Sequence, residues 1–337
     1  MKYIAFAASP NQLISIKEYI YQNNIDNYSL YIFFTKNLKI NNEIYSTLKI
    51  LKLKKIIKIT RNNNYILSLI KNILLLINLF FKYKNIKKIF IITDFLNTFY
   101  HILRLIFKES KFILVDDGMA IFWIYQKYLT RKIYLPINQR KGFFKNKSKI
   151  KNFFFDFDFL KNKKFEVFTM YADELKLKQE HKNKLIYTKN LRKKKYKFNK
   201  DLVYIIGTKY FESDILTLDE EIKILKKIDN FWKNKNCIYV AKRTTSIKKI
   251  LFIKKHLNIP VIYFELPLEL AFIYSKKELP LYVCSMGSSL DFTLPALFKR
   301  IDYYFINFNS LKKKISLKTI QFILLIFSKC ITVKKKL

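Results

Sequence analysis

Short apolar segments alternate with longer amphipathic segments along most of this chain, and this alternation limits the folds that the chain can adopt. In the first third the apolar segments are KYIAFAA (2–8), YSLYIFFT (28–35), KKIIKIT (54–60), KKIFIITD (87–94) and KFILVDDG (111–118). Between them, residues 9–23 predict a loop and a helix that Ser9 or Asn11 can cap, and residues 95–108 show the apolar i, i+3, i+4 spacing of a helix face. Strands that are apolar on both faces and alternate with helices predict a parallel sheet covered on both sides.

A second series of the same kind begins near residue 200. Its predicted strands are DLVYIIGT (201–208), CIYV (237–240), IPVIYFE (259–265), PLYVC (280–284) and IDYYFIN (301–307), whereas residues 130–200 are basic and loop-like. We therefore predict an α/β fold of two Rossmann-like βα domains that face a central cleft. The predicted domains are residues 1–190 and 191–310, followed by a basic tail at 311–337.

Two segments bear on membrane contact. The ten uncharged residues of NILLLINLFF (72–81) are about half of what a transmembrane helix needs, so they predict a core helix. The tail at 311–337 has an apolar centre flanked by lysine clusters. This pattern fits a basic amphipathic helix lying in the interface of an anionic membrane, and equally a terminal helix packed on the protein with its lysines in solvent.

The charge balance is strongly basic, with 65 Lys and Arg against 25 Asp and Glu. Lysine greatly outnumbers arginine, whereas recognition of phosphates and bases favours arginine, and neither zinc-finger nor RNA-binding signatures occur. We therefore expect no nucleic-acid partner. The three cysteines and three histidines are scattered, which predicts a reducing compartment and no metal site.

The sequence KFILVDDG places two adjacent carboxylates and a glycine directly after a predicted buried strand. In parallel sheets, ligands bind beyond the carboxyl ends of the strands. Asp116 or Asp117 is therefore a candidate general base, with Gly118 beside it at the turn. The alternative is that one aspartate only caps the next helix while Gly118 makes the turn.

The sequence CSMGSSLDF (284–292) combines a turn with a helix start. Gly287 permits a tight turn after the preceding strand, and Ser288 and Ser289 then offer hydroxyls beside free backbone N–H groups. This arrangement can bind a phosphate, although the serines can equally serve as ordinary helix caps. The chain has only four glycines, so Gly207 at the end of DLVYIIGT is also a candidate for a close ligand approach.

Charged residues also follow two other strands of the second series. Lys242 and Arg243 stand at a strand end, where they can neutralise a phosphate or can simply be exposed basic residues. Pro267 and Glu269 open the next predicted helix. Glu269 can accept hydrogen bonds from ribose hydroxyls or can stabilise the helix dipole.

Taken in order, five short motifs resemble the bacterial lipooligosaccharide sialyltransferases and polysialyltransferases. The motifs are SPNQL (9–13, with Ser9 and Asn11), VDDG (115–118), YVAKRTTS (239–246), PLE (267–269) and SMGSSL (285–290). The resemblance implies a two-domain glycosyltransferase of the GT-B type, with an acceptor-binding N-terminal domain and a nucleotide-sugar-binding C-terminal domain. The tandem βα layout agrees with that fold.

The resemblance also implies an activity. It implies inverting, metal-independent transfer of sialic acid, or a related nonulosonic acid, from CMP-sialic acid to a cell-surface glycan such as lipooligosaccharide or capsule. One of the aspartates would be the base, Ser288 and Ser289 would hold the CMP phosphate, and Glu269 would lie near the ribose. We expect no cofactor, and a cytoplasmic enzyme at the inner face of the cell membrane.

The chain departs from the family pattern at one position. The histidine that the family uses near the leaving group corresponds to Lys242 here, which is followed by Arg243. A lysine stabilises negative charge but donates a proton poorly at neutral pH. The sequence therefore leaves two alternatives to a CMP-sialic-acid-dependent enzyme: a GT-B transferase with another nucleotide sugar, and a non-catalytic glycan-binding or nucleotide-binding relative.

Overall fold

The chain divides into two compact units, Met1–Tyr187 and Thr188–Leu337. The computed structural model describes residues 1–35, 37–60, 65–93, 103, 106–107, 109–115, 165–171, 195–242, 244–288, 290–298 and 300–305. The predicted site residues Asp116, Asp117, Gly118, Arg243 and Ser289 and the basic tail lie outside these ranges.

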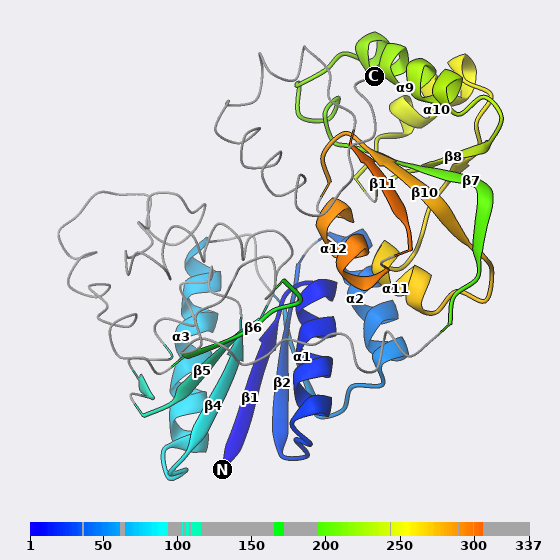
Figure 1. The fold of residues 1–337 in the computed structure, drawn as a ribbon. Helices are drawn as coiled ribbons and strands as arrows, with labels where there is room; N and C mark the ends of the chain where they lie inside the picture. Colours follow the sequence, from blue (N-terminus) through cyan, green and yellow to red (C-terminus); the bar gives the residue numbers. More distant parts are fainter. Residues whose placement is uncertain are drawn as a thin grey trace. The chain divides into compact units, whose positions relative to one another are not determined.

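A parallel sheet forms the centre of the N-terminal unit (Figure 1). The elements of this unit are β1 (Lys2–Ala7), α1 (Pro10–Gln22), β2 (Tyr28–Phe34), α2 (Leu38–Leu51), β3 (Ile56–Thr60), α3 (Tyr65–Tyr83), β4 (Ile89–Thr93), β5 (Lys111–Val115) and β6 (Phe165–Phe168). The strand order is β3-β2-β1-β4-β5-β6, and every pair is parallel. The predicted parallel sheet is confirmed, but α2 was not predicted, and the segment containing β6 was predicted to be loop-like.

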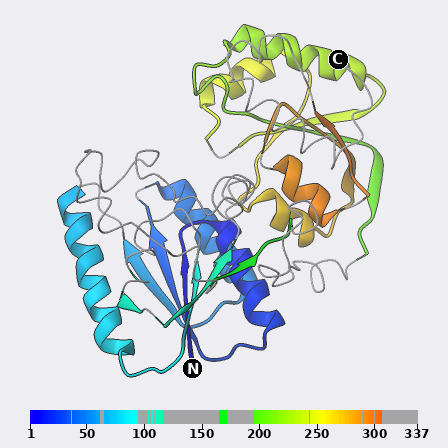
Figure 2. The same ribbon diagram turned by 60° about the vertical axis from the view of Figure 1, so that its left-hand side comes forward.

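Helices cover the two faces of this sheet, α1 and α2 on one and α3 on the other (Figure 2). The helix α1 starts as predicted from its sequence. Ser9 is its N-cap and accepts a hydrogen bond from Gln12 N at 3.3 Å, and Pro10 occupies the first turn, where no N–H is needed. Asn11 is not the cap but lies inside the helix. The central strands are apolar and buried on both faces, as expected for a sheet between two helical layers.

The segment predicted to be a core helix, residues 72–81, forms part of α3 but is buried on one side only. Leu76 and Leu79 are buried, whereas Leu74 and Phe81 are 59% and 63% exposed. Six of these ten residues are exposed, so the prediction of a core helix was wrong for most of them. Ten uncharged residues in a row occupy every side of a helix, whereas the sheet covers only one side. In the part of the chain that the structure describes, no helix combines the length and hydropathy needed to span a bilayer.

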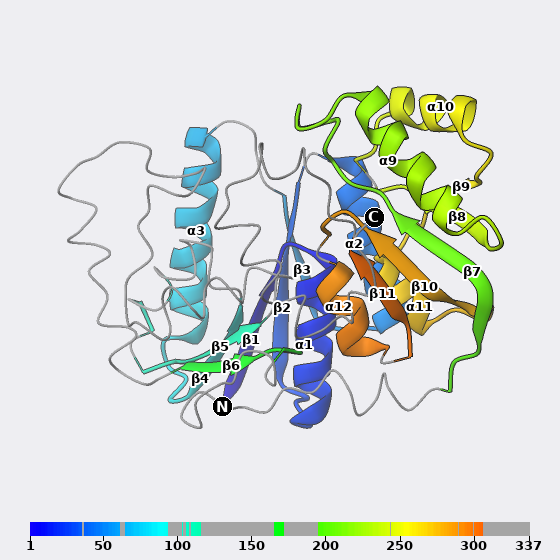
Figure 3. The ribbon, with the colours of Figure 1, turned by 45° about the horizontal axis from the view of Figure 1, so that its top comes forward.

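The C-terminal unit contains a second parallel sheet, of order β11-β10-β7-β8-β9 (Figure 3). Its elements are β7 (Phe198–Ile206), α9 (Leu218–Phe231), β8 (Asn236–Val240), α10 (Ile247–His256), β9 (Val261–Ile262), α11 (Leu268–Ile273), β10 (Leu279–Ser285), α12 (Leu290–Leu297) and β11 (Asp302–Phe305). The helices α9 and α10 cover one face, and α11 and α12 cover the other. A capping box between Thr217 and Glu220 starts α9, and the Ser246 hydroxyl caps α10.

Among the described residues, most of those with a positive φ are not glycine. Asn24, Lys52, Lys55 and Asp214 have φ between 49° and 54°, and Gly287 has φ of 109°. The first three belong to connections that enter strands β2 and β3.

Candidate active site

The strands of the C-terminal unit end in one row. Cα partners pair Ser285 of β10 with Ile206 of β7, and Ile206 with Val240 of β8. Because the three strands are parallel, the chain leaves each of them at the same edge of the sheet. The segments that follow them are therefore neighbours, and they carry the predicted site residues Gly207, Lys242, Gly287 and Ser288.

The order of strands in this sheet reverses between β7 and β10. From β7 the chain adds β8 and β9 on one side, and it then crosses to add β10 and β11 on the other. Ligands of open α/β sheets bind outside the carboxyl ends of the strands at such a reversal. The segments after β7 and β10 are consequently the best candidates for a binding site in this unit.

The segment after β10 forms the turn predicted from its sequence. Gly287 has φ of 109°, a conformation that only glycine adopts readily, and its N–H donates to Ser285 Oγ at 3.1 Å. Ser288 is buried, and its hydroxyl accepts from Leu290 N at 3.3 Å at the start of α12. Ser288 therefore caps a helix at the strand reversal, so the cap and the candidate anion site are the same structure.

Tyr210 joins the two segments that flank the reversal. Its hydroxyl, on the segment after β7, donates to the carbonyl oxygen of Met286 after β10 at 2.5 Å. Tyr210 was not predicted from the sequence, because one tyrosine among many has no local pattern that distinguishes it. The bond ties the segment after β7 to the turn that contains Gly287.

Gly207 lies where no side chain fits. A Cβ atom there would be 2.7 Å from Tyr239 Oη and 3.0 Å from the Val240 carbonyl oxygen, to which Gly207 N already donates at 2.9 Å. The close packing of β7 against β8 thus explains this glycine without a ligand. Its predicted role in substrate binding stays a prediction.

Lys242 lies two residues beyond β8, at the same edge. The Lys242 carbonyl oxygen accepts from Thr245 N at 2.9 Å, which closes a tight turn before Ser246 caps α10. The side chain of Lys242 is half-buried. The turn therefore holds the backbone of Lys242 at a fixed position on the carboxyl edge.

A buried ion cluster lies behind this turn and was not found from the sequence. Lys249 of α10 is fully buried, with its Nζ 2.5 Å from Glu221 Oε1 of α9 and 3.7 Å from Glu212 Oε2. Lys249 Nζ also donates to the Thr208 carbonyl oxygen at 2.8 Å. One ammonium group thereby connects the segment after β7 with two helices.

The cluster also holds the start of α10. Glu212 Oε1 accepts from Ser246 N at 2.9 Å, so the turn that carries Lys242 is tied to the segment after β7. Burial raises the pKa of Glu221, although Lys249 acts in the opposite direction. Burial and then the charges of Glu221 and Glu212 raise the pKa of Tyr239 well above its ordinary value, which keeps this hydroxyl protonated.

Pro267 and Glu269 lie at the start of α11, on the other face of the sheet. Pro267 is the N-cap residue, without a side-chain cap bond. Glu269 is buried, and its Oε1 accepts from Thr293 Oγ1 of α12 at 2.6 Å. In this position Glu269 joins the two helices that follow β9 and β10, and its predicted place near a ribose stays a prediction.

The N-terminal sheet has the same kind of reversal, between β1 and β4. Ser9 follows β1 there, and Thr93 ends β4 with a buried hydroxyl that has no hydrogen-bond partner among the described residues. The next strand, β5, ends at buried Val115, directly before Asp116 in the sequence. The predicted base thus follows a strand adjacent to the reversal.

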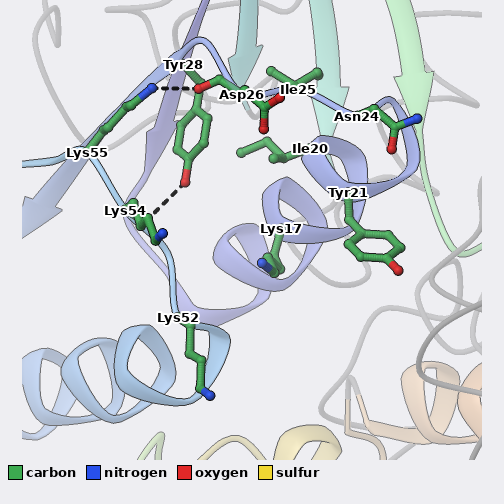
Figure 4. Close-up of a pocket in the computed structure, with 10 residues that line it drawn as sticks. All are labelled: Lys17, Ile20, Tyr21, Asn24, Ile25, Asp26, Tyr28, Lys52, Lys54 and Lys55. Atoms are coloured by element: carbon green, nitrogen blue, oxygen red, sulfur yellow. Dashed lines mark hydrogen bonds between the residues drawn. The ribbon is translucent and has the colours of Figure 1, made fainter.

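A pocket of about 450 Å³ opens at the opposite, amino edge of the N-terminal sheet (Figure 4). Four lysines line it, Lys17, Lys52, Lys54 and Lys55. Lys55 Nζ donates to the Asp26 carbonyl oxygen at 2.6 Å. The pocket contains none of the predicted site residues, and it lies at the edge where ligands of parallel sheets do not normally bind.

Among the residues that the structure describes, no group of three or more His, Cys, Asp or Glu side chains could hold a metal ion.

Comparisons with solved structures agree with this architecture. A putative UDP-N-acetylglucosamine 2-epimerase from Listeria monocytogenes is similar at 10% identity and a TM-score of 0.51, over 97% of this chain and 88% of that chain. The UDP-GlcNAc 2-epimerase from Methanocaldococcus jannaschii is similar at 14% identity and a TM-score of 0.50, over 100% of this chain and 94% of that chain. The predicted two-domain α/β fold of the GT-B class is confirmed.

The family follows from the sequence comparison. The model of the alpha-2,8-polysialyltransferase (POLYST) family matches residues 3–306, and the chain belongs to that family. It is thus a glycosyltransferase of the sialyltransferase kind. No curated protein sequence matches the chain.

Proposed function

We propose that this protein transfers sialic acid, or a related nonulosonic acid, from CMP-sialic acid to a cell-surface glycan with inversion at the anomeric carbon. One observation carries the assignment of the donor site. The Gly287–Ser288 turn stands at the strand reversal of the C-terminal sheet, where a nucleotide phosphate is expected. Family membership supports a sialic acid as the transferred sugar.

The proposed reaction is a single displacement. The acceptor hydroxyl oxygen forms a bond to the anomeric carbon of the sugar while the bond from that carbon to the CMP phosphate oxygen breaks. The carboxylate of Asp116 or Asp117 takes the hydroxyl proton, and CMP leaves with the electron pair. The backbone and hydroxyls of Ser288 and Ser289 hold the phosphate, and Lys242 with Arg243 stabilises its charge.

Neither a metal ion nor a cofactor takes part in this mechanism. Of the possible acceptors, lipooligosaccharide and capsule both fit a glycan at the cell surface. We place the enzyme in the cytoplasm, in peripheral contact with an anionic membrane.

Nucleotide binding tests the donor. Titration calorimetry with CMP, UDP and GDP is expected to give a dissociation constant for CMP at least about tenfold lower than for the other two, a difference of about 1.4 kcal/mol. We expect this difference because a CMP-specific site recognises the cytosine base, which UDP and GDP lack, whereas all three nucleotides can make the phosphate contacts. Equal affinities would reject CMP-sialic acid as the donor and favour a transferase with another nucleotide sugar.

Substitution of Lys242 tests whether the absence of the family's histidine lowers the rate of transfer. A lysine stabilises the departing phosphate without donating a proton at neutral pH, whereas a histidine can do both. We therefore expect Lys242→His to raise kcat about tenfold or more with CMP-sialic acid, while KM for the donor changes little.

The pH profile of the same variant provides a second measurement. Its kcat should fall as the introduced histidine loses its proton. A Lys242→His variant slower than the natural protein would mean that the lysine is adapted to its task. Binding of CMP without transfer by either protein would favour the non-catalytic alternative, for which the missing histidine is the supporting observation.

A further inference from the structure

The helix α3 carries a continuous apolar surface on the outer side of the N-terminal unit. Seven large apolar side chains are between 41% and 63% exposed: Leu67, Ile70, Ile73, Leu74, Ile77, Phe80 and Phe81. At about 100° per residue, these positions fall within an arc of about 140° on the helix. From Leu67 to Phe81, at 1.5 Å per residue, the surface extends for about 21 Å along the helix. Exposed apolar patches of this extent mark interaction sites.

Basic residues surround this surface. Lys71 and Lys82 lie along one border of the arc, and Lys84, Lys87 and Lys88 are exposed in the connection that follows the helix. From Ile44 to Thr93 the sequence contains ten lysines and one arginine and no Asp or Glu. The partner of this surface therefore has to supply all the negative charge.

The connections that enter neighbouring strands add to the same positive field. The pKa of Lys2 at the start of β1 is lowered, first by partial burial and then by the charges of Lys55 and Lys82. Lys2 begins β1, Lys55 precedes β3, and Lys82 lies in the last turn of α3. The end of α3 therefore belongs to a wider basic edge of the N-terminal unit.

We propose that α3 is the membrane-docking element of this protein, lying in the interface of an anionic bilayer with its apolar side chains among the acyl chains and its lysines at the headgroups. An apolar helix face bordered by lysines is the pattern of an interfacial helix. A second copy of the chain would bring two uniformly basic surfaces together, at a net charge of +40 each, which opposes association. The inference rests on the peripheral membrane contact proposed above, and it assigns that contact to the exposed face of α3.

Binding of the full-length protein to vesicles tests this inference. Cosedimentation is measured with vesicles of equal parts phosphatidylcholine and phosphatidylglycerol, and with vesicles of phosphatidylcholine alone. We expect Leu74→Asn/Phe81→Asn to bind the anionic vesicles at least about tenfold more weakly than the natural protein, because each side chain loses an apolar contact with lipid. Binding should also weaken at high salt and on neutral vesicles.

The matched control is Ile247→Asn/Leu251→Asn. These two side chains of α10 are 76% and 61% exposed, so they resemble Leu74 and Phe81 in exposure but lie in the other unit. The control should bind vesicles as the natural protein does, and both variants should keep the unfolding midpoint, since the substituted side chains lie at the surface.

Three results would overturn the inference. They are absence of vesicle binding by the natural protein, equal binding by the α3 variant and the control, and an α3-dependent dimer in light scattering without vesicle binding. Transfer to a soluble acceptor separates this inference from the proposed reaction. The α3 variant should retain that activity. If the natural protein, the α3 variant and the control all lack transfer activity, the result contradicts the proposed reaction but not the membrane docking of α3.

Discussion

Lys249→Met is expected to lower the free energy of unfolding by about 3–5 kcal/mol, because it leaves the buried carboxylate of Glu221 and the partly buried carboxylate of Glu212 without their cation. Lys249 is fully buried, and its Nζ is 2.5 Å from Glu221 and 3.7 Å from Glu212. Methionine keeps most of the volume of the side chain. The decrease in the free energy of unfolding therefore measures the loss of the charge and of the hydrogen bond to the Thr208 carbonyl oxygen, and not a cavity. Urea unfolding followed by circular dichroism measures the change.

The neighbouring lysine supplies the control. Lys248 is exposed on the same helix, and Lys248→Met should change the free energy of unfolding by about 0.5 kcal/mol or less. The double variant Lys249→Met/Glu221→Gln should recover part of the loss, since it removes one of the unpaired charges. If Lys249→Met unfolds within about 1 kcal/mol of the natural protein, the cluster does not stabilise the fold as the distances indicate.

Transfer activity should fall about 100-fold to 10,000-fold in one of the two variants Asp116→Asn and Asp117→Asn. Asparagine is similar in size and hydrogen-bonding reach but cannot accept the proton of the acceptor hydroxyl. The effect should appear in kcat, while KM for the donor stays within a few-fold, because the base acts on the acceptor. Initial rates at saturating donor, with release of CMP as the readout, give both constants.

Asp26→Asn serves as the comparison for this experiment. Asp26 is an exposed aspartate at the amino edge of the same unit, where it lines the pocket with the four lysines, and the variant should keep full activity. Full activity in both Asp116→Asn and Asp117→Asn would show that the base lies elsewhere in the chain.

Much of the architecture could be predicted because parallel strands carry a strong local signal. Apolar runs such as KYIAFAA and YSLYIFF identify their own strands, and Ser9 identifies the start of α1. The strand β6 was missed because its four residues stand in a long basic segment and owe their conformation to pairing with β5. Short strands of this kind depend on tertiary contacts that no local pattern reveals.

The candidate site was predicted in part. Glycine and serine after a strand mark the turn at Gly287–Ser288 from local chemistry alone, and the strand order then places it at the reversal. Lys249 could not be singled out, because it is one of many lysines and the helix pattern does not show which of them faces inward. Its only sequence signal is its position four residues before the buried Ile253.

The connections of this molecule differ in which residue takes a positive φ: a side-chain-bearing residue in some, and glycine in one. Lys52, Lys55 and Asn24 take that conformation at the amino edge of the N-terminal sheet, at roughly 1–2 kcal/mol each relative to a right-handed conformation. The turn after β10 instead has φ of 109° and is made by Gly287, one of only four glycines in the chain. A fourth such residue, Asp214, lies in the segment after β7. A composition poor in glycine therefore places part of its backbone strain on lysine, asparagine and aspartate in the connections, whereas the turn after β10 keeps a glycine.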